Sequence, residues 1–490
     1  MIEDPKTSDD DSKKSFGRDV GKLVSGTIIA QIAAACFYPV ITRIFNPDLL
    51  GVASVFIATV SIITAISCLR YELAIILPKN DNDAGAILLA CVVILTCVCL
   101  VSTLIFFLFE DIIADLVGNP NVKIYFFLVP LAVFIDGFYL ALRYWNTRRR
   151  RFGTQAATQT LQSVSGSGLK LGFGVAGFVT SGALILGQII GNFFGMFILF
   201  LQVIKYDFTL IRSSFSWKNI RAQMVRYKKF PIYNIWSALF NSLSGNIPVF
   251  LLTMFFSSTV TGLYALGMYV VQVPMNFIGS SISQVFLQRS AIAKRDNALS
   301  DLARDTCSVL VIISVLPFVL LCILGGDLFT IVFGEQWREA GVYVQIIGLW
   351  AMMRFIVSPL TYIAIVVEKQ EINLVYNIIL FVTRVVVLVL GGVYGSVYLA
   401  LVLFMISGVA IYGGIGYLCV IVWAKVSLKE IWNQVKNPLI ITVLLTLVVL
   451  MMSLVIESSL ILCTISTLIG GGYIFYIFKS QPLVRAYIGR

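Results

Sequence analysis

Residues 85–107 read GAILLACVVILTCVCLVSTLIFF, an uninterrupted run without a charged side chain. A helix needs about 20 mostly apolar residues to cross the hydrocarbon core of a bilayer, so this run predicts one membrane span. The whole chain has the same character, because 59% of its 490 residues are hydrophobic and only 12% are charged. A soluble domain carries roughly 25% charged residues. The sequence therefore predicts an all-α integral membrane protein.

About fourteen segments of this kind are predicted along the chain. They lie at about residues 20–45, 49–69, 85–107, 124–145, 155–178, 183–204, 230–256, 262–287, 306–324, 342–366, 373–393, 397–423, 439–456 and 460–478. A polar tail at residues 1–18 precedes them and has no apolar core of the kind that a cleavable signal peptide contains.

The basic residues alternate between the two ends of these segments. All but seven of the 36 Lys and Arg lie in or next to the N-terminus, the even-numbered connections and the C-terminus. Cytoplasmic loops of membrane proteins carry such an excess, so both termini are predicted to be cytoplasmic, in a bacterial inner membrane. Residues 148–151, four arginines in a row, fit this topological signal. The alternative, a nucleic-acid patch, is disfavoured, and no nucleic-acid partner is predicted.

The sequence offers little for catalysis or for a bound cofactor. The chain has no histidine, and its nine cysteines include no CxxC pair, so neither a metal site nor a catalytic residue is predicted. The stretch around residues 17–23 lacks the spacing and the Ser/Thr of a P-loop, which argues against ATP hydrolysis. A coupling ion, H⁺ or Na⁺, is the only small partner expected beside the substrate. The chain is predicted to be a transporter and not an enzyme.

Two short motifs recur with nearly the same offset. FNPDLLG at residues 45–51 matches FSSTVTG at 256–262, and DIIADLVG at 111–118 matches DLFTIVFG at 327–334. The step from position 45 to 256 is nearly equal to the step from 111 to 327. Six spans per repeat give two lobes of the same orientation, with a binding site between them near the bilayer midplane. Chance similarity between apolar segments is the alternative.

The repeat predicts how the chain is divided. The expected parts are a cytoplasmic tail at 1–18, an N-lobe at 19–206, a cytoplasmic linker at 207–228, a C-lobe at 229–424, and two further helices with a C-terminal tail at 425–490. The lobes are expected to enclose a central cavity.

Four basic residues fall inside predicted spans: Arg143, Lys170, Arg354 and Arg384. A charge at the bilayer centre costs about 2.5–3.5 kcal/mol on insertion scales, so these side chains must face protein or a wet cavity. Asp136 is the only acid deep within a span. The surplus of positive charge predicts an anionic ligand such as a pyrophosphate, bound by charge-assisted hydrogen bonds. The alternatives are that Arg143 reaches the headgroups and that Asp136 pairs with a neighbouring cation.

Polar side chains recur at helical spacing and predict the lining of the cavity. They are Gln155, Gln159, Gln162, Asn234, Asn241, Gln272, Asn276 and Asn377. Amides both donate and accept hydrogen bonds, which suits sugar hydroxyls, although hydrogen bonds between helices are an equally open role. Asp136 is the candidate for ion coupling, since a carboxylate in a site of low dielectric binds a proton more readily.

Two motifs resemble a known family. Residues 43–51, RIFNPDLLG, are similar to a signature of polysaccharide and O-antigen flippases, and residues 70–78, RYELAIILP, resemble the segment after the second helix of those proteins. They belong to the multidrug/oligosaccharidyl-lipid/polysaccharide (MOP) exporter superfamily. Arg43, Arg70 and Glu72, within these motifs, are the gate candidates.

The resemblance implies two six-helix lobes around a V-shaped cavity, alternating access, and undecaprenyl-pyrophosphate-linked repeat units as the cargo. The product would be O-antigen, capsule or exopolysaccharide. It also implies that the last two helices guide the lipid tail. Membrane lipids, and a polymerase and glycosyltransferases of the same pathway, are the partners to be expected.

Two other functions compete with the flippase. An ion-coupled multidrug exporter of the same superfamily would require an acidic cavity for its cationic substrates, and four cations against one acid disfavour it. A membrane polymerase or ligase of the polysaccharide pathway tends to carry a large outer loop. No outer connection here exceeds about twenty residues.

Overall fold

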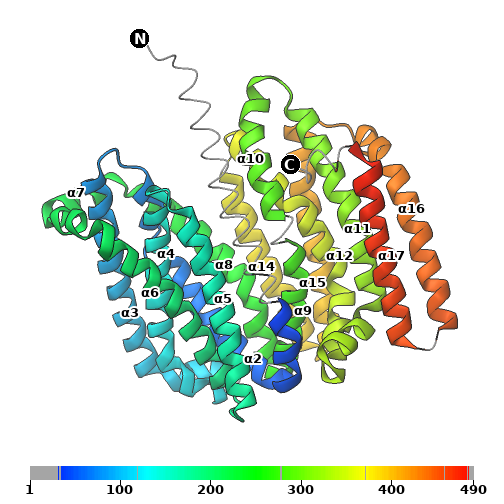
Figure 1. Cartoon of the computed structure of the whole chain (residues 1–490), viewed down its shortest axis with the longest axis horizontal. Coiled ribbons are helices and arrows are strands. Elements are labelled where there is room, and N and C mark those ends of the chain that lie inside the picture. The colour runs from blue at the N-terminus through cyan, green and yellow to red at the C-terminus, as the bar shows by residue number, and fades with distance from the viewer. Residues whose placement is uncertain are drawn as a thin grey trace. The chain divides into compact units, whose positions relative to one another are not determined.

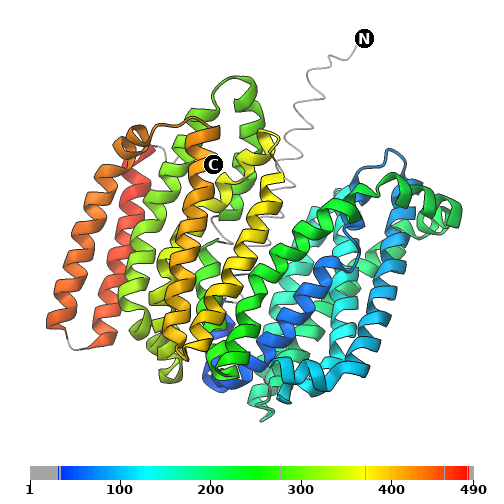
Figure 2. The same cartoon turned by 180° about the vertical axis from the view of Figure 1, so that it is seen from behind.

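The computed structural model describes residues 31, 35–117, 120–275, 279–369, 371–456, 458–482 and 484. Within these ranges the secondary structure is helical throughout, and no strand is found (Figures 1 and 2). The chain divides into two compact units, Met1–Asn246 and Ile247–Arg490. Each unit is described by itself below.

Unit 1 contains the first half of the predicted spans. After a helix at Ala35–Ile44, it consists of α2 (Pro47–Ile66), η1 (Tyr71–Ile76), α3 (Asp81–Val117), η2 (Pro120–Leu128), α4 (Val129–Arg148), α5 (Phe152–Val175), α6 (Ser181–Ser214), α7 (Trp217–Arg226) and η3 (Phe230–Asn234). The helix α8 (Ile235–Phe255) follows and runs across the division between the units.

Unit 2 contains the remaining helices. They are α9 (Ser258–Pro274), α10 (Ser280–Arg295), α11 (Leu299–Phe333), η5 (Glu335–Trp337), α12 (Arg338–Leu360), α13 (Tyr362–Val366), α14 (Glu371–Val393), α15 (Val397–Tyr417), η6 (Leu418–Trp423), α16 (Leu428–Val455) and α17 (Ser459–Ser480). The last two pack on α11, where the Tyr473 hydroxyl donates to the carbonyl of Ile312 over 3.1 Å and accepts from Thr442 over 3.1 Å.

The first repeated motif begins a helix in both units. Asn46 is the N-cap of α2, and its side-chain oxygen accepts a hydrogen bond from the Leu49 amide over 3.0 Å. Pro47 follows at the first helical position, where a missing N–H costs nothing. Ser257, at the corresponding place in the second motif, caps α9 by accepting from the Val260 amide over 3.2 Å. An N-cap side chain satisfies an amide that has no partner inside the helix. The two motifs therefore play the same local role.

All fourteen predicted spans overlap helices, but the number fourteen is not confirmed. Eleven helices among the described residues are long and apolar enough to cross a membrane. The helix α5 is not among them, because its N-terminal half is rich in Gln, Ser and Thr. The helix α9 ends at Pro274 after 17 residues, and the first predicted span is described only at residue 31 and from residue 35 onward.

Candidate functional site

Two cations of unit 2 share one aromatic ring. Arg384 of α14 and Arg354 of α12 were both predicted to bind an anionic ligand. The Cζ atom of Arg384 lies 5.7 Å from the centroid of the Trp350 ring, and that of Arg354 lies 5.5 Å from it. Arg384 is only 8% exposed. A single indole therefore brings the two guanidiniums together in the interior of this unit.

Aromatic side chains from two helices fix this pair of cations. The Arg384 Cζ also lies 5.2 Å from the ring centroid of Phe404 on α15. The Trp350 and Phe404 rings meet edge to face at 5.0 Å, and Tyr412 contacts Trp350 at 6.4 Å. Gly408 of α15 makes room for the indole, because a Cβ at this position would collide with it. A guanidinium over an aromatic face is stabilised by the ring quadrupole. We call Arg354, Arg384 and Trp350 the arginine pair site.

The arginine pair site offers donors and few acceptors. Arg354 forms no ion pair with any residue that the structure describes. The indole Nε1 of Trp350 is buried and has no hydrogen-bond partner among the described residues. Guanidinium and indole nitrogens only donate hydrogen bonds, so the site is suited to a ligand rich in anionic oxygens. Trp350 was not predicted from the sequence.

A second polar cluster lies inside unit 1. The Nζ of Lys170 on α5 donates to Gln188 Oε1 over 2.6 Å, Gln188 Nε2 donates to Asn192 Oδ1 over 3.2 Å, and Asn192 Nδ2 donates to Asp136 Oδ1 over 2.8 Å. These four residues connect α5, α6 and α4 in a single chain of hydrogen bonds. We call them the Asp136 chain.

The Asp136 chain borders a cavity of about 310 Å³. Asp136, Gln188 and Asn192 line it, together with the hydroxyl-bearing Ser61 and Thr64 of α2. The Thr64 hydroxyl oxygen is buried and has no hydrogen-bond partner among the described residues. The cavity thus brings a carboxylate, amide oxygens and a hydroxyl together at one place. Such oxygens are able to bind a proton or a small hard cation.

Glycines position the Asp136 chain. A Cβ at Gly191 of α6 would come within 2.6 Å of the Gly166 Cα of α5, so the two helices approach backbone to backbone. The Lys170 side chain lies across Gly187, where a Cβ would come within 2.6 Å of its Cγ. The spacing Gly187-x-x-x-Gly191-x-x-x-Gly195 predicts helix packing only. Gln188 and Asn192, four residues apart beside these glycines, were the signal that was missed.

The other predicted lining residues are in varied surroundings. Gln155 is 2% exposed and donates to the Arg143 carbonyl over 3.1 Å and to the Thr147 hydroxyl over 3.0 Å, so it makes the interhelical contact that was the alternative role. The Arg143 guanidinium lies 6.0 Å from the ring of its neighbour Tyr144. Gln162 packs against Gly195. The remaining predicted residues differ in exposure. Gln159, Gln272 and Asn377 are half-buried, and Asn234 and Asn241 are exposed. Asn276 lies outside the described residues.

Of the gate candidates, Arg70 and Glu72 form an ion pair with an N–O distance of 3.3 Å, while Arg43 is exposed. Leu69 and Arg70 have φ angles of 48° and 65°, which turn the chain sharply between α2 and η1. Burial raises the pKa of the Glu72 carboxyl, and the neighbouring Arg70 opposes this shift. The Tyr71 hydroxyl donates to the carbonyl of Met224 on α7 over 2.9 Å.

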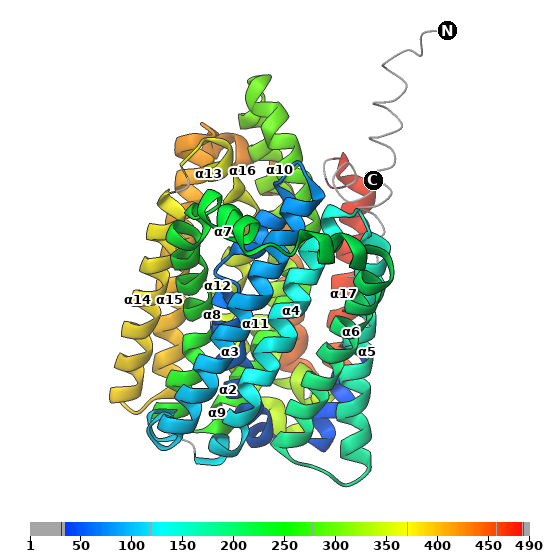
Figure 3. The ribbon, with the colours of Figure 1, turned by 90° about the vertical axis from the view of Figure 1, so that its left-hand side faces the viewer.

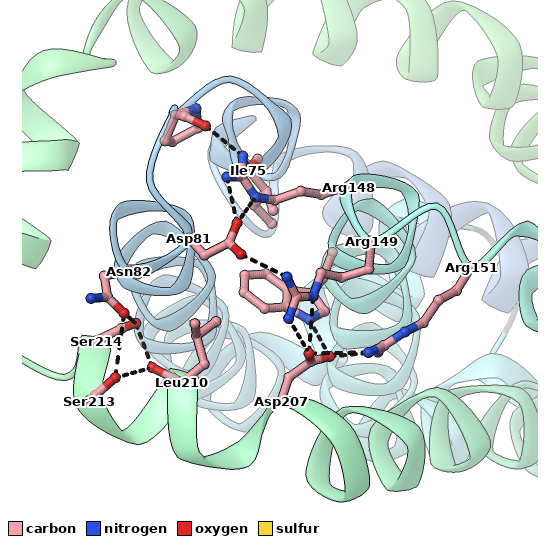
Figure 4. Close-up of polar contacts among 12 residues, drawn as sticks. Ile75, Asp81, Asn82, Arg148, Arg149, Arg151, Asp207, Leu210, Ser213 and Ser214 are labelled. Atoms are coloured by element: carbon pink, nitrogen blue, oxygen red, sulfur yellow. Dashed lines mark hydrogen bonds and ion pairs between the residues drawn. The ribbon is translucent and has the colours of Figure 1, made fainter. Parts of the chain in front are cut away.

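The run of arginines at 148–151 has a structural role beside the topological one (Figure 4). Arg148 donates through Nε and Nη2 to Asp81 Oδ1 over 3.0 and 2.8 Å. Arg149 bridges Asp81 and Asp207, with distances of 2.7 and 2.8 Å. Arg151 binds Asp207 over 2.6 Å. Two acids therefore hold three of the four arginines and connect α3, the corner between α4 and α5, and α6.

A family model and a curated relative match this chain. The model of a family described as polysaccharide biosynthesis protein matches residues 40–342. A protein from Klebsiella pneumoniae, described as an uncharacterized membrane protein in the cps region, is 23% identical over 279 residues, or 55% of this chain. The match spans 57% of that relative, so little more than half of its length is compared.

Solved transporter structures share the fold. The lipid II flippase MurJ, in an inward closed conformation, has a TM-score of 0.73 and 12% identity, and the match covers 93% of this chain and 98% of that one. A mutant of the Vibrio cholerae MATE transporter VcmN has a TM-score of 0.54 and 14% identity, covering 84% and 97%. An inward-facing MATE family transporter of the MOP superfamily has a TM-score of 0.53, with 14% identity and coverage of 84% and 95%. The predicted all-α fold of this superfamily is confirmed.

Proposed function

This chain belongs to the polysaccharide biosynthesis protein family, and on that premise we propose that it is a flippase for polyprenyl-pyrophosphate-linked oligosaccharides. The cargo would be an undecaprenyl-pyrophosphate-linked repeat unit of a surface polysaccharide such as O-antigen, capsule or exopolysaccharide. The protein would turn it from the cytoplasmic to the outer leaflet of the bacterial inner membrane by alternating access, with both termini in the cytoplasm. A polymerase and glycosyltransferases would act before and after it.

The strongest support for a flippase of pyrophosphate-linked lipids is the arginine pair site. Two guanidinium carbons, 5.5 and 5.7 Å from the centroid of the Trp350 ring, create a concentrated positive charge in a helix-lined interior. Pyrophosphate is an anion whose oxygens match guanidinium donors in bidentate geometry. Lys170 and Arg143, in unit 1, remain proposed headgroup contacts of the other lobe. Of the amides predicted to line the cavity, the half-buried Gln159, Gln272 and Asn377 would bind the sugar hydroxyls.

The lipid chain has a suitable surface on the last two helices. An apolar cavity of about 540 Å³ lies between α16 and α17 and is lined by Ile441, Leu445, Ile469, Gly472, Tyr473 and Tyr476. A polyprenyl tail is a long hydrocarbon whose burial is favourable wherever apolar side chains replace water or loosely packed lipid. This supports the role of tail guide that the family resemblance implied.

The experiment that tests the function is a comparison of two ligand classes. The purified protein in detergent would be titrated with a polyprenyl-pyrophosphate oligosaccharide and with a cationic dye, and its melting temperature followed. A ligand that binds only the folded state raises stability by about 2.7 kcal/mol at 100 times its Kd. We expect a shift with the pyrophosphate lipid and none with the dye. A shift with the dye alone would favour the multidrug exporter.

Asp136 is proposed as the ion-coupling residue, and Asp136→Asn is expected to abolish the response of translocation to an imposed H⁺ or Na⁺ gradient. One charge moved across 100 mV is worth about 2.3 kcal/mol, roughly a fiftyfold bias in transport direction. The amide preserves the size of the side chain but has no negative charge, so it neither takes up and releases a proton nor balances the charge of a sodium ion. The measurement is cargo movement in proteoliposomes with and without the gradient.

The matched control is Asp296→Asn, which removes a carboxylate from an exposed connection. It should retain the full response. If Asp136→Asn responded to both gradients as strongly as the wild type does, the ion-coupling role would have to be given up.

A further inference from the structure

The helix α7 is a short surface helix that lies between two membrane-spanning helices, α6 and α8, in the chain (Figure 3). Its inner face is fixed to unit 1. Ile220 is 2% exposed and packs against Ala86 and Ala90 of α3. The Met224 carbonyl accepts the hydrogen bond from the Tyr71 hydroxyl over 2.9 Å. Because these contacts set the rotation of α7, its opposite face is presented outward in a defined orientation.

The outward face of α7 combines large apolar and basic side chains. Trp217 is 63% exposed and Val225 is 58% exposed. Lys218 and Arg221 are exposed between them. At about 100° per residue these four side chains fall within roughly one third of the helix circumference. Phe215, 56% exposed, adds an aromatic ring just before the helix. A helix of this composition is typical of the interface between headgroups and acyl chains.

Among the described residues, no acid forms an ion pair with the basic side chains around α7. Residues 208–235 contain six Lys and Arg and no Asp or Glu. The six are Arg212, Lys218, Arg221, Arg226, Lys228 and Lys229. None of them forms an ion pair with a described residue. Asp207, which precedes the segment, is buried and already bound by Arg149 and Arg151.

We propose that α7 lies in the headgroup layer and binds anionic phospholipids. Lys218 and Arg221 would contact the lipid phosphates, while Phe215, Trp217 and Val225 enter the acyl boundary. The connection to two spans keeps α7 at the bilayer surface, and the exposed aromatic rings suit that boundary better than they suit an acidic soluble protein. This binding is separate from the cargo and does not depend on what the protein transports.

The test is hydrogen–deuterium exchange of the full chain in nanodiscs. The discs contain phosphatidylcholine with increasing amounts of phosphatidylglycerol. We expect the amides of residues 215–226 to become protected as phosphatidylglycerol is added. Each basic residue near an anionic surface contributes about a fivefold factor in affinity. The double variant Lys218→Gln/Arg221→Gln should therefore need about 25-fold more anionic lipid for the same protection, or lose it within the accessible range.

The control variant is Lys429→Gln/Lys436→Gln, which removes the same charge from α16. It should keep the protection of residues 215–226. Equal loss in both double variants, or no dependence of the wild type on phosphatidylglycerol, would overturn the proposal. Protection by soluble polyglutamate but not by phosphatidylglycerol would overturn it as well, in favour of an acidic protein partner. If the α7 variant failed to fold, the wild-type titration would still decide.

Discussion

Replacing Arg384 with alanine is expected to lower the rate of cargo translocation by about 10- to 150-fold, because a hydrogen bond to a charged group contributes about 1.5–3 kcal/mol. Arg384 is 8% exposed and lies over the rings of Trp350 and Phe404, so its guanidinium is held in place before the ligand arrives. Arg354→Ala should act in the same direction through the same ring. The measurement is the initial rate of movement of a fluorescent lipid-linked oligosaccharide in proteoliposomes.

Two further substitutions of Arg384 and one control elsewhere separate the effect of charge from that of packing. Arg384→Met keeps the length of the stem and removes the charge, so it should fold like the wild type and still be slow. Arg384→Lys keeps the charge and loses the bidentate geometry, so its translocation rate should lie between that of Arg384→Met and that of the wild type. Arg295→Ala removes an exposed arginine of α10 and should be unchanged. A wild-type rate in both Arg384→Met and Arg354→Ala would exclude the arginine pair site as the headgroup site.

Asp207→Ala is expected to cause the largest loss of stability, about 3–5 kcal/mol in the free energy of unfolding. The Asp207 side chain is 0% exposed and accepts hydrogen bonds from Arg149, Arg151 and the indole of Trp145. Its removal leaves two arginines without their shared counter-charge. Because these arginines are 28% and 21% exposed, water compensates in part, and we expect a loss of about 3 kcal/mol, at the lower end of this range. Reversible denaturation in mixed detergent would measure it.

A surface ion pair provides the comparison for Asp207. Asp111 pairs with Lys123 over 2.6 Å, but its side chain is 78% exposed. Exposed pairs contribute about 0–1 kcal/mol, so Asp111→Ala should be nearly neutral. Asp207→Asn, which still accepts hydrogen bonds, should fall between the two. If Asp207→Ala were as mild as Asp111→Ala, the cluster in Figure 4 would not be what holds α3, α4 and α6 together.

The presence of the helices was predictable because local chemistry determines it, but most of their ends were not: the span predicted at 306–324 lies within α11, which runs over Leu299–Phe333. An apolar run of sufficient length is helical in a membrane whatever its neighbours are. The FNPD motif begins α2 because Asn46 and Pro47 satisfy the helix start by themselves. Three of the fourteen predicted spans are not among the eleven helices that are long and apolar enough to cross a membrane: α5 is too polar, α9 is too short, and the first span is described only in part.

The partners of the polar residues were harder to predict. Asp136 and Lys170 stood out as charges within apolar segments, but the amides that join them, Gln188 and Asn192, lie on another helix. Which side chains meet depends on how α4, α5 and α6 are rotated against one another, and the spacing of residues along each helix does not give that rotation. The arginine run is a similar case. Its acids lie 67 and 58 residues away from Arg148 and Arg149.

The activity that we propose for this protein is the movement of a lipid-linked pyrophosphate oligosaccharide across a bilayer. The most direct measurement is the protection of such a lipid, labelled on its sugar, from a membrane-impermeant quencher in proteoliposomes with and without the wild-type protein. We expect rapid redistribution between the leaflets only when the protein is present. We also expect competition by an unlabelled polyprenyl pyrophosphate. Redistribution no faster than in protein-free liposomes, while a cationic dye is extruded, would mean that the protein is not a flippase for this lipid.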